Sequence, residues 1–78
     1  MQKLRTDMDI GQNIQTLRRN AKLTQDMVIA QMGAMGIDLS KSTYAKLETN
    51  RMNIKVSELV ALAKILDCEV GDFFKDLK

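Results

Sequence analysis

The stretch DLSKSTYAKLETN, residues 38–50, contains a helix start, a helix end and an unusual outer face. Ser40 can act as the N-cap, because its hydroxyl accepts a hydrogen bond from a backbone N–H of the first turn. Tyr44 and Leu47 lie three residues apart and turn inward, and Asn50 can adopt the left-handed conformation that ends a helix. The stretch therefore predicts a short helix over about residues 41–49. Its outer face carries two cations among short side chains: Lys41, Ser42, Thr43, Ala45 and Lys46.

Two helices are expected before this one. The first follows Asp9, a plausible N-cap, and places Ile10, Ile14, Leu17 and Ala21 at helical spacing. The second follows Thr24, another N-cap candidate, and carries Val28, Met32 and Met35 at positions i, i+4 and i+7. Either Gly33 or Gly36 ends the second helix.

Two further helices are expected after it. The segment VSELVALAKIL, residues 56–66, places five apolar side chains on one face: Val56, Leu59, Val60, Ala63 and Leu66. A short fifth helix near residues 70–77 contains Val70, Phe73, Phe74 and Leu77. No stretch alternates in the manner of a strand. The sequence predicts an all-α, compact domain of five helices.

Length and composition set bounds on the function. The chain has 78 residues, 45% of them hydrophobic, with no proline and one cysteine, so we expect one small globular domain over residues 1–78. The single cysteine excludes an internal disulfide and favours the cytoplasm. No apolar run reaches the roughly 18–20 residues that cross a membrane. Because the sequence has no histidine and no cluster of metal ligands, we expect no enzyme, no metal and no cofactor.

Charge is distributed unevenly along the chain. Residues 1–55 contain nine Lys/Arg and five Asp/Glu, whereas residues 56–78 contain three and five. The first part could face a polyanion, although ordinary charge scatter explains the same counts. The predicted third helix offers a specific reason for such a face. The major groove of B-DNA admits one α-helix, and short side chains near its start let the backbone approach the bases.

The segments IGQNIQTLRRNAKLTQ, STYAKLE and LVALAKIL together resemble the Cro/repressor-type, lambda-repressor-like helix-turn-helix domains of the xenobiotic response element family. The resemblance covers residues 9–74, leaving residues 1–8 as an N-terminal arm. It implies that the second and third helices form the helix-turn-helix and that the third enters the major groove. It also implies a set of DNA contacts: Thr24, Gln25, Ser40, Lys41, Ser42, Thr43, Lys46, Asn50 and Arg51. Phosphate contacts are favoured over base contacts for Lys41 and Lys46, and Ser40 is first a helix cap. Arg18 and Glu48 match a family pair that forms an internal salt bridge.

The resemblance has one conspicuous departure. The link QMGAMGIDLS between the second and third helices is about four residues longer than the usual tight turn of the family. Either the second helix extends by one turn, to Met35 with Gly36 after it, or the link forms a wider loop. Both alternatives would affect how the third helix meets DNA.

The function expected from the resemblance is sequence-specific regulation of transcription, as a repressor on double-stranded operator DNA. Useful specificity requires two half-sites, so a homodimer is expected, with Val70, Phe73, Phe74 and Leu77 as candidate contacts. For the two phenylalanines, closing the core is the competing interpretation. An alternative function is a protein-interaction module on the same scaffold, such as an antitoxin or adaptor. Neither function requires a small-molecule substrate or a membrane.

Overall fold

The computed structural model describes residues 10–75. Four α-helices follow one another: α1 (Ile10–Asn20), α2 (Gln25–Ala34), α3 (Lys41–Glu48) and α4 (Val56–Ile65). A 3₁₀ helix, η1 (Val70–Phe74), completes the described part of the chain. No strand occurs within residues 10–75, so the predicted all-α class is confirmed.

The predicted fifth helix is wrong in kind and in length, because η1 is a single 3₁₀ segment of five residues. Asn13 Nδ2 donates hydrogen bonds to the carbonyl oxygens of Phe73 (2.8 Å) and Lys75 (2.6 Å). Lys75 itself has extended backbone angles. Since Asn13 occupies these carbonyls and Lys75 leaves the helical region, the helix does not continue. Asp9 and Leu77, named as cap and apolar residue above, lie outside the described residues.

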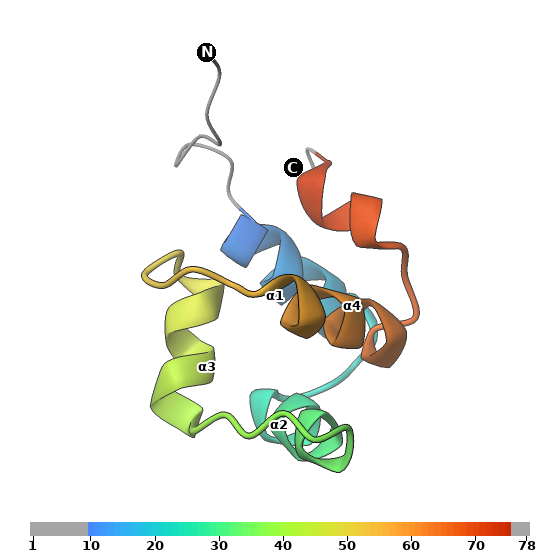
Figure 1. The fold of residues 1–78 in the computed structure, drawn as a ribbon. Helices are drawn as coiled ribbons and strands as arrows, with labels where there is room; N and C mark the ends of the chain where they lie inside the picture. Colours follow the sequence, from blue (N-terminus) through green and yellow to red (C-terminus); the bar gives the residue numbers. More distant parts are fainter. Residues whose placement is uncertain (1–9, 76–78) are drawn as a thin grey trace.

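In the view of Figure 1, α1 and α4 cross in the middle, with α3 at the left, α2 below and η1 above. α1 contacts α3 and η1, while α2 contacts α3 and α4. The largest fully buried side chains come from all five segments: Ile14, Val28, Met32, Tyr44, Leu62 and Phe73. Every segment therefore contributes to one core. No helix within residues 10–75 is long and apolar enough to cross a bilayer.

The predicted apolar face of α4 is only half correct. Leu59, Ala63 and Leu66 are buried as expected, but Val56 is 77% exposed and Val60 is 39% exposed. Leu62, which was not assigned to the face, is completely buried. The side of α4 that meets the core is thus rotated toward Leu62, since α4 packs between α2 and η1.

The long link between α2 and α3 is resolved in favour of the extended helix. α2 ends at Ala34, with Met35 as its C-cap and Gly36 following at φ +87°. The Ile37 N–H donates to the Met32 carbonyl (2.9 Å), and the Gly36 N–H donates to the Gly33 carbonyl (3.0 Å). These two bonds form a Schellman motif, which requires a left-handed residue and makes glycine the natural choice. Gly36 therefore ends α2, and Gly33 lies inside it.

Candidate nucleic-acid interface

The N-terminus of α3 is fixed by its cap. Ser40 has extended backbone angles, and its Oγ accepts a hydrogen bond from the Thr43 N–H (3.1 Å). The same hydroxyl donates to Thr43 Oγ1 (2.9 Å). Thr24 caps α2 in the same way, with Oγ1 accepting from the Met27 N–H (3.1 Å). Both caps match their predictions, because N-capping depends only on residues within one turn.

The C-terminus of α3 ends as the sequence predicted. Asn50 has φ +60°, and the Arg51 N–H donates to the Lys46 carbonyl (2.9 Å). The Asn50 side chain also acts on α1, because its Oδ1 accepts a hydrogen bond from the Gly11 N–H (2.8 Å). One residue thus ends α3 and accepts a hydrogen bond from the first turn of α1, whose backbone N–H groups have no partner within the helix itself.

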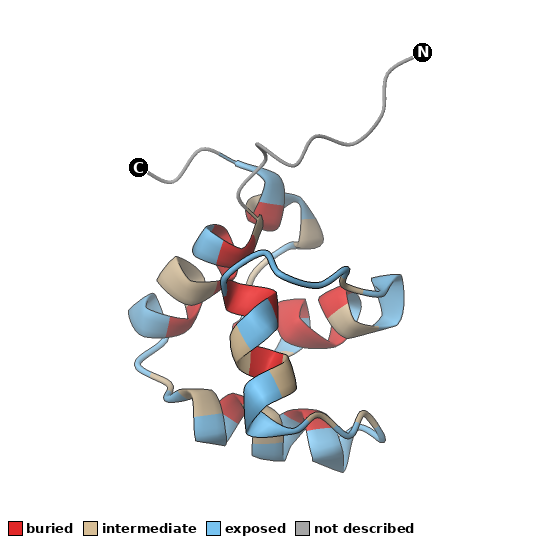
Figure 2. Cartoon of the chain, turned by 90° about the vertical axis from the view of Figure 1, so that its left-hand side faces the viewer, coloured by how far each residue is buried: buried red, intermediate tan, exposed pale blue. Residues whose placement is uncertain are grey.

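α3 presents an exposed stripe opposite its buried side. Tyr44, Leu47 and Glu48 are buried against the rest of the molecule. Figure 2 views the molecule from the side of α3 and shows exposed positions running along the helix. The exposed residues of this surface, from α3 and the turn after it, are Lys41, Ser42, Lys46, Thr49, Asn50 and Arg51. Three of the six are cationic, so the stripe is suited to an anionic partner.

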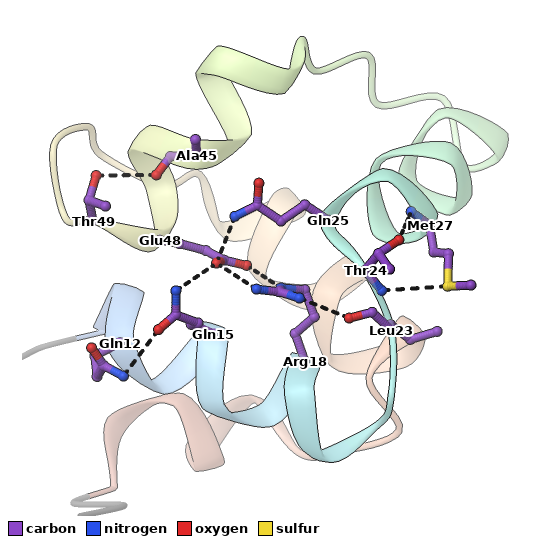
Figure 3. A network of polar contacts seen from close by, with 10 residues as sticks. All are labelled: Gln12, Gln15, Arg18, Leu23, Thr24, Gln25, Met27, Ala45, Glu48 and Thr49. Carbon is purple, nitrogen blue, oxygen red and sulfur yellow. Dashed lines mark hydrogen bonds and ion pairs between the residues drawn. The ribbon is translucent and has the colours of Figure 1, made fainter.

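The buried carboxylate of Glu48 is the centre of a polar network that joins three helices (Figure 3). Arg18 Nε donates to Glu48 Oε2 (2.7 Å) and Arg18 Nη2 to Glu48 Oε1 (3.2 Å), which makes a two-pronged ion pair. Gln25 Nε2 donates to Glu48 Oε1 (3.0 Å), and Gln15 Nε2 approaches the same oxygen at 3.4 Å. Arg18 Nη1 also donates to the Leu23 carbonyl (2.8 Å). The network therefore fixes α3 relative to α1 and to the beginning of α2.

The ionisation of this network follows from its contacts. Burial by itself would raise the pKa of Glu48, but the hydrogen bonds from Arg18 and Gln25 lower it, and the pKa lies below the ordinary value. The hydrogen bond to Glu48 raises the pKa of Arg18. Burial raises the pKa of Tyr44, whose side chain lies beside the pair. Arg18 and Glu48 are therefore both charged at neutral pH.

Close backbone packing brings α1 against the end of α3. A Cβ atom at Gly11 would lie 2.5 Å from the Leu47 carbonyl oxygen and 2.7 Å from that of Glu48. These distances are far below van der Waals contact, and both neighbours are backbone atoms. Only glycine fits here, so Gly11 sets how closely the two helices approach.

A comparison with protein-family models finds a match over most of the chain. A family described as helix-turn-helix (HTH_3, the Cro/C1 type) matches residues 14–73. The chain belongs to this family. The predicted resemblance is confirmed, and the match implies a DNA-binding regulator. No curated protein and no solved structure matches the chain significantly.

Within this helix-turn-helix domain, the residues predicted to bind DNA divide into two groups. Ser42, Lys46 and Arg51 are exposed on the α3 side, and neither Lys46 nor Arg51 has an acidic partner within residues 10–75. Ser42 Oγ lies 3.3 Å from Ser40 Oγ, and Arg51 Nε donates to Thr49 Oγ1 (3.1 Å), so these contacts stay within the exposed surface. The other six residues take part in helix capping or in contacts between segments. Thr24 and Ser40 cap helices, Thr43 bonds to Ser40, Gln25 bonds to Glu48, Asn50 bonds to α1, and Lys41 pairs with Asp26.

The candidate dimer contacts within the described residues differ in how far they are exposed. Phe73 is completely buried, so its assignment as a dimer contact is corrected: it closes the core beneath η1. Val70 is half-buried and packs against the core, while Phe74 remains 39% exposed. Of the four residues, Phe74 is thus the most exposed candidate in the described chain.

Sequence reasoning missed three residues that shape this site: Gly11, Gln15 and Asp26. Gln15 and Asp26 occupy ordinary polar positions on α1 and α2, and only the packing of three helices brings them near α3. A glycine one residue inside a helix was the available indication for Gly11. No group of three or more acidic, cysteine or histidine residues that could hold a metal ion occurs within residues 10–75.

Proposed function

We propose that this protein is a sequence-specific regulator of transcription, a cytoplasmic repressor that inserts α3 into the major groove of operator DNA. The observation that best supports this proposal is that α3 has an exposed cationic stripe on one side and is held firmly by the rest of the protein on the other. Lys41, Ser42 and Lys46 lie on the outer side of α3, whose inner side is fixed by Tyr44, Leu47 and the Arg18–Glu48 pair. A recognition helix needs both properties, because its side chains must reach base edges at a defined register.

The side chains of the stripe suit two kinds of contact. Lys46 and Arg51 can neutralise phosphates, which provides most of the affinity and no sequence information. Because the Ser42 side chain is short, the α3 backbone can lie close to the groove. The Ser42 hydroxyl can then hydrogen-bond to a base edge or a phosphate. The capped N-terminus of α3 adds a favourable partial charge for a phosphate. Operator preference would then come from the N-terminal turn of α3, around Ser42, while Lys41 contacts phosphate.

Repression would result from occupying DNA that RNA polymerase needs. The proposed DNA-binding helix and the contacts that hold it lie within the described residues, and the proposed binding uses protein side chains. A homodimer would place two copies of α3 on adjacent half-sites, and Phe74 with Val70 is the proposed contact surface.

The test is DNA binding by the purified protein at about 50 and 200 mM salt, with duplexes taken from around its own gene. We expect preference for one duplex over competitor DNA, and a loss of affinity at the higher salt because counterions are released on binding. Lys46→Ala should reduce affinity and lower the salt slope by about one unit. Lys64→Ala, an exposed lysine on α4, is the matched control and should leave both nearly unchanged.

The alternative, an antitoxin or adaptor on the same scaffold, predicts a different outcome. Such a protein would bind a protein partner at high salt and would be indifferent to Lys46→Ala. No binding to any duplex at about 50 mM salt would contradict the DNA-binding proposal and favour this alternative.

A further inference from the structure

An ion pair spans the helix-turn-helix at the position where the two helices begin. Lys41, the first residue of α3, has its Nζ 3.0 Å from Oδ1 of Asp26, the second residue of α2. Both side chains are well exposed, at 59% for Lys41 and 78% for Asp26. Lys41 thus differs from Lys46 and Arg51, which have no acidic partner in the described part of the chain.

This ion pair is poorly suited to holding the fold. Exposed ion pairs contribute little to stability, because water and salt screen them. α2 and α3 are already joined by the core residues Val28, Met32 and Tyr44, and by the Gln25–Glu48 hydrogen bond. Asp26 in the first turn also interacts favourably with the α2 dipole, a contribution to stability that does not depend on Lys41. The main consequence of the pair is therefore electrostatic, at the surface proposed to meet DNA.

We infer that Asp26 sets the affinity and selectivity of this domain by competing with DNA phosphate for Lys41. The inference rests on the proposed function. To neutralise a phosphate, Lys41 must leave Asp26, and the carboxylate then remains beside the polyanion. Both steps oppose binding.

The competition should act unequally on different DNA sequences. Non-specific binding is almost entirely electrostatic, whereas operator binding includes base contacts that Asp26 does not oppose. A negative charge beside Lys41 therefore removes a larger share of the non-specific affinity. Asp26 would in this way raise the ratio of operator affinity to non-specific affinity, because its charge repels all DNA while operator binding keeps its base contacts.

The experiment compares Asp26→Asn with the wild type on two labelled duplexes of equal length, one carrying the preferred site and one unrelated. Asp67→Asn is the matched control, because it removes one exposed negative charge in the turn after α4. Its backbone is left-handed at φ +56°, which asparagine tolerates. Circular dichroism and thermal melting verify that each variant is folded. Binding is measured by fluorescence anisotropy at about 50 and 200 mM salt.

We expect Asp26→Asn to bind the unrelated duplex about threefold or more tightly than the wild type at about 50 mM salt, as expected for one nearby unit charge in water. The gain on the preferred duplex should be smaller, so selectivity falls. Asp67→Asn should change either affinity by less than about twofold. In a Lys41→Ala background, Asp26→Asn should lose at least half of its effect, because the competition has been removed.

Two results would overturn the inference while leaving the proposed function intact. One is an effect of Asp26→Asn no larger than that of Asp67→Asn. The other is weaker binding by Asp26→Asn, which would mean that Asp26 holds Lys41 in the DNA-binding position. If the wild type binds neither duplex at about 50 mM salt, the proposed function itself fails and the inference falls with it.

Discussion

Glu48 connects the stability of this domain to the position of its candidate DNA-binding helix. Its side chain is 1% exposed and accepts hydrogen bonds from α1 and α2, although it belongs to α3. When a buried ion pair loses one of its two charges, the remaining charge is buried without a partner. This loss costs more free energy than the intact pair contributes. Stability and the orientation of α3 should therefore change together when this residue is altered.

Acid should destabilise the protein through Glu48. The pKa of this carboxyl is lower in the folded state, so the unfolded chain binds the proton more tightly. The resulting stability is fully present above the unfolded pKa of about 4.3 and is lost as the pH falls through the folded pKa. Urea unfolding between about pH 7 and pH 3 should show this decline.

Substitution of Glu48 distinguishes its contribution to the acid dependence of stability from that of the other carboxylates. Glu48→Gln should lower the free energy of unfolding by about 3 kcal/mol at neutral pH, because Arg18 loses its buried counter-charge, and it should flatten the acid dependence. Glu58→Gln is the control, since Glu58 Oε1 accepts a hydrogen bond from the local Lys55 N–H (2.9 Å) and has no ion pair within residues 10–75. An unchanged acid dependence in Glu48→Gln would show that other carboxylates cause the decline.

At the scale of helices, the glycines inside α1 and α2 have different structural roles. The missing side chain of Gly11 admits the backbone of α3, whereas a Cβ at Gly33 would meet only Asp38 Oδ1, at 3.9 Å. We expect Gly11→Ala to destabilise the protein by about 1–3 kcal/mol through overpacking. Gly33→Ala should stabilise it by about 0.5–1 kcal/mol, because alanine is the better helix former.

Thermal and urea unfolding of these two variants would measure the difference in one experiment. A stabilised Gly11→Ala would mean that α1 and α3 lie further apart than the structure places them. Because Gly11 lies against the last turn of α3, its substitution should also weaken DNA binding, whereas Gly33→Ala should leave it unchanged.

The faces of α4 make a second comparison between helix positions. Leu62→Ala should cost about 2–5 kcal/mol, because Leu62 is completely buried. Val56→Ala should change stability by less than about 0.5 kcal/mol, because Val56 is 77% exposed. Equal losses in the two variants, measured by urea unfolding, would support the face predicted from the sequence instead.

That comparison also shows why local features were easier to predict than packing. Ser40, Thr24 and Asn50 act within a single turn, so their neighbours in sequence are enough to identify a cap or a helix end. For α2 the sequence left two candidate ends, Gly33 and Gly36, and the left-handed angle of Gly36 decides between them. α4 has two stripes with the same spacing, both of which include Leu59 and Ala63. One continues through Val56 and the other through Leu62, and only contact with the other segments decides between them.

The same distinction applies to the candidate site. The exposed face of α3 could be predicted because the apolar residues of one short helix define its inner side. The Asp26–Lys41 pair and the close approach of Gly11 join residues 15 and 36 or more positions apart, and nothing in their local sequence identifies the partner. The family resemblance provided the Arg18–Glu48 pair, which sequence spacing alone would not have suggested.

At the scale of the whole molecule, one copy of α3 is too short to select a site in a genome. Its eight residues span about 12 Å along the helix axis, so it can contact only a few base pairs. If α3 reads DNA as proposed, the competition from about 10⁶ or more genomic sites makes a second copy on a neighbouring half-site the expected source of selectivity. Two-fold symmetry then requires both copies to meet one face of the duplex.

This requirement leads to a prediction about spacing. Once the preferred duplex is known, inserting about five base pairs between its half-sites turns them to opposite faces of the DNA. We expect affinity to fall to that of a single half-site, and Phe74→Ser to reduce affinity for the intact duplex without affecting the half-site. Gel-shift titrations of the intact, inserted and half-site duplexes would measure both effects. Equal affinity for all three duplexes would mean that the domain binds DNA as a monomer, and that the exposed Phe74 serves another contact.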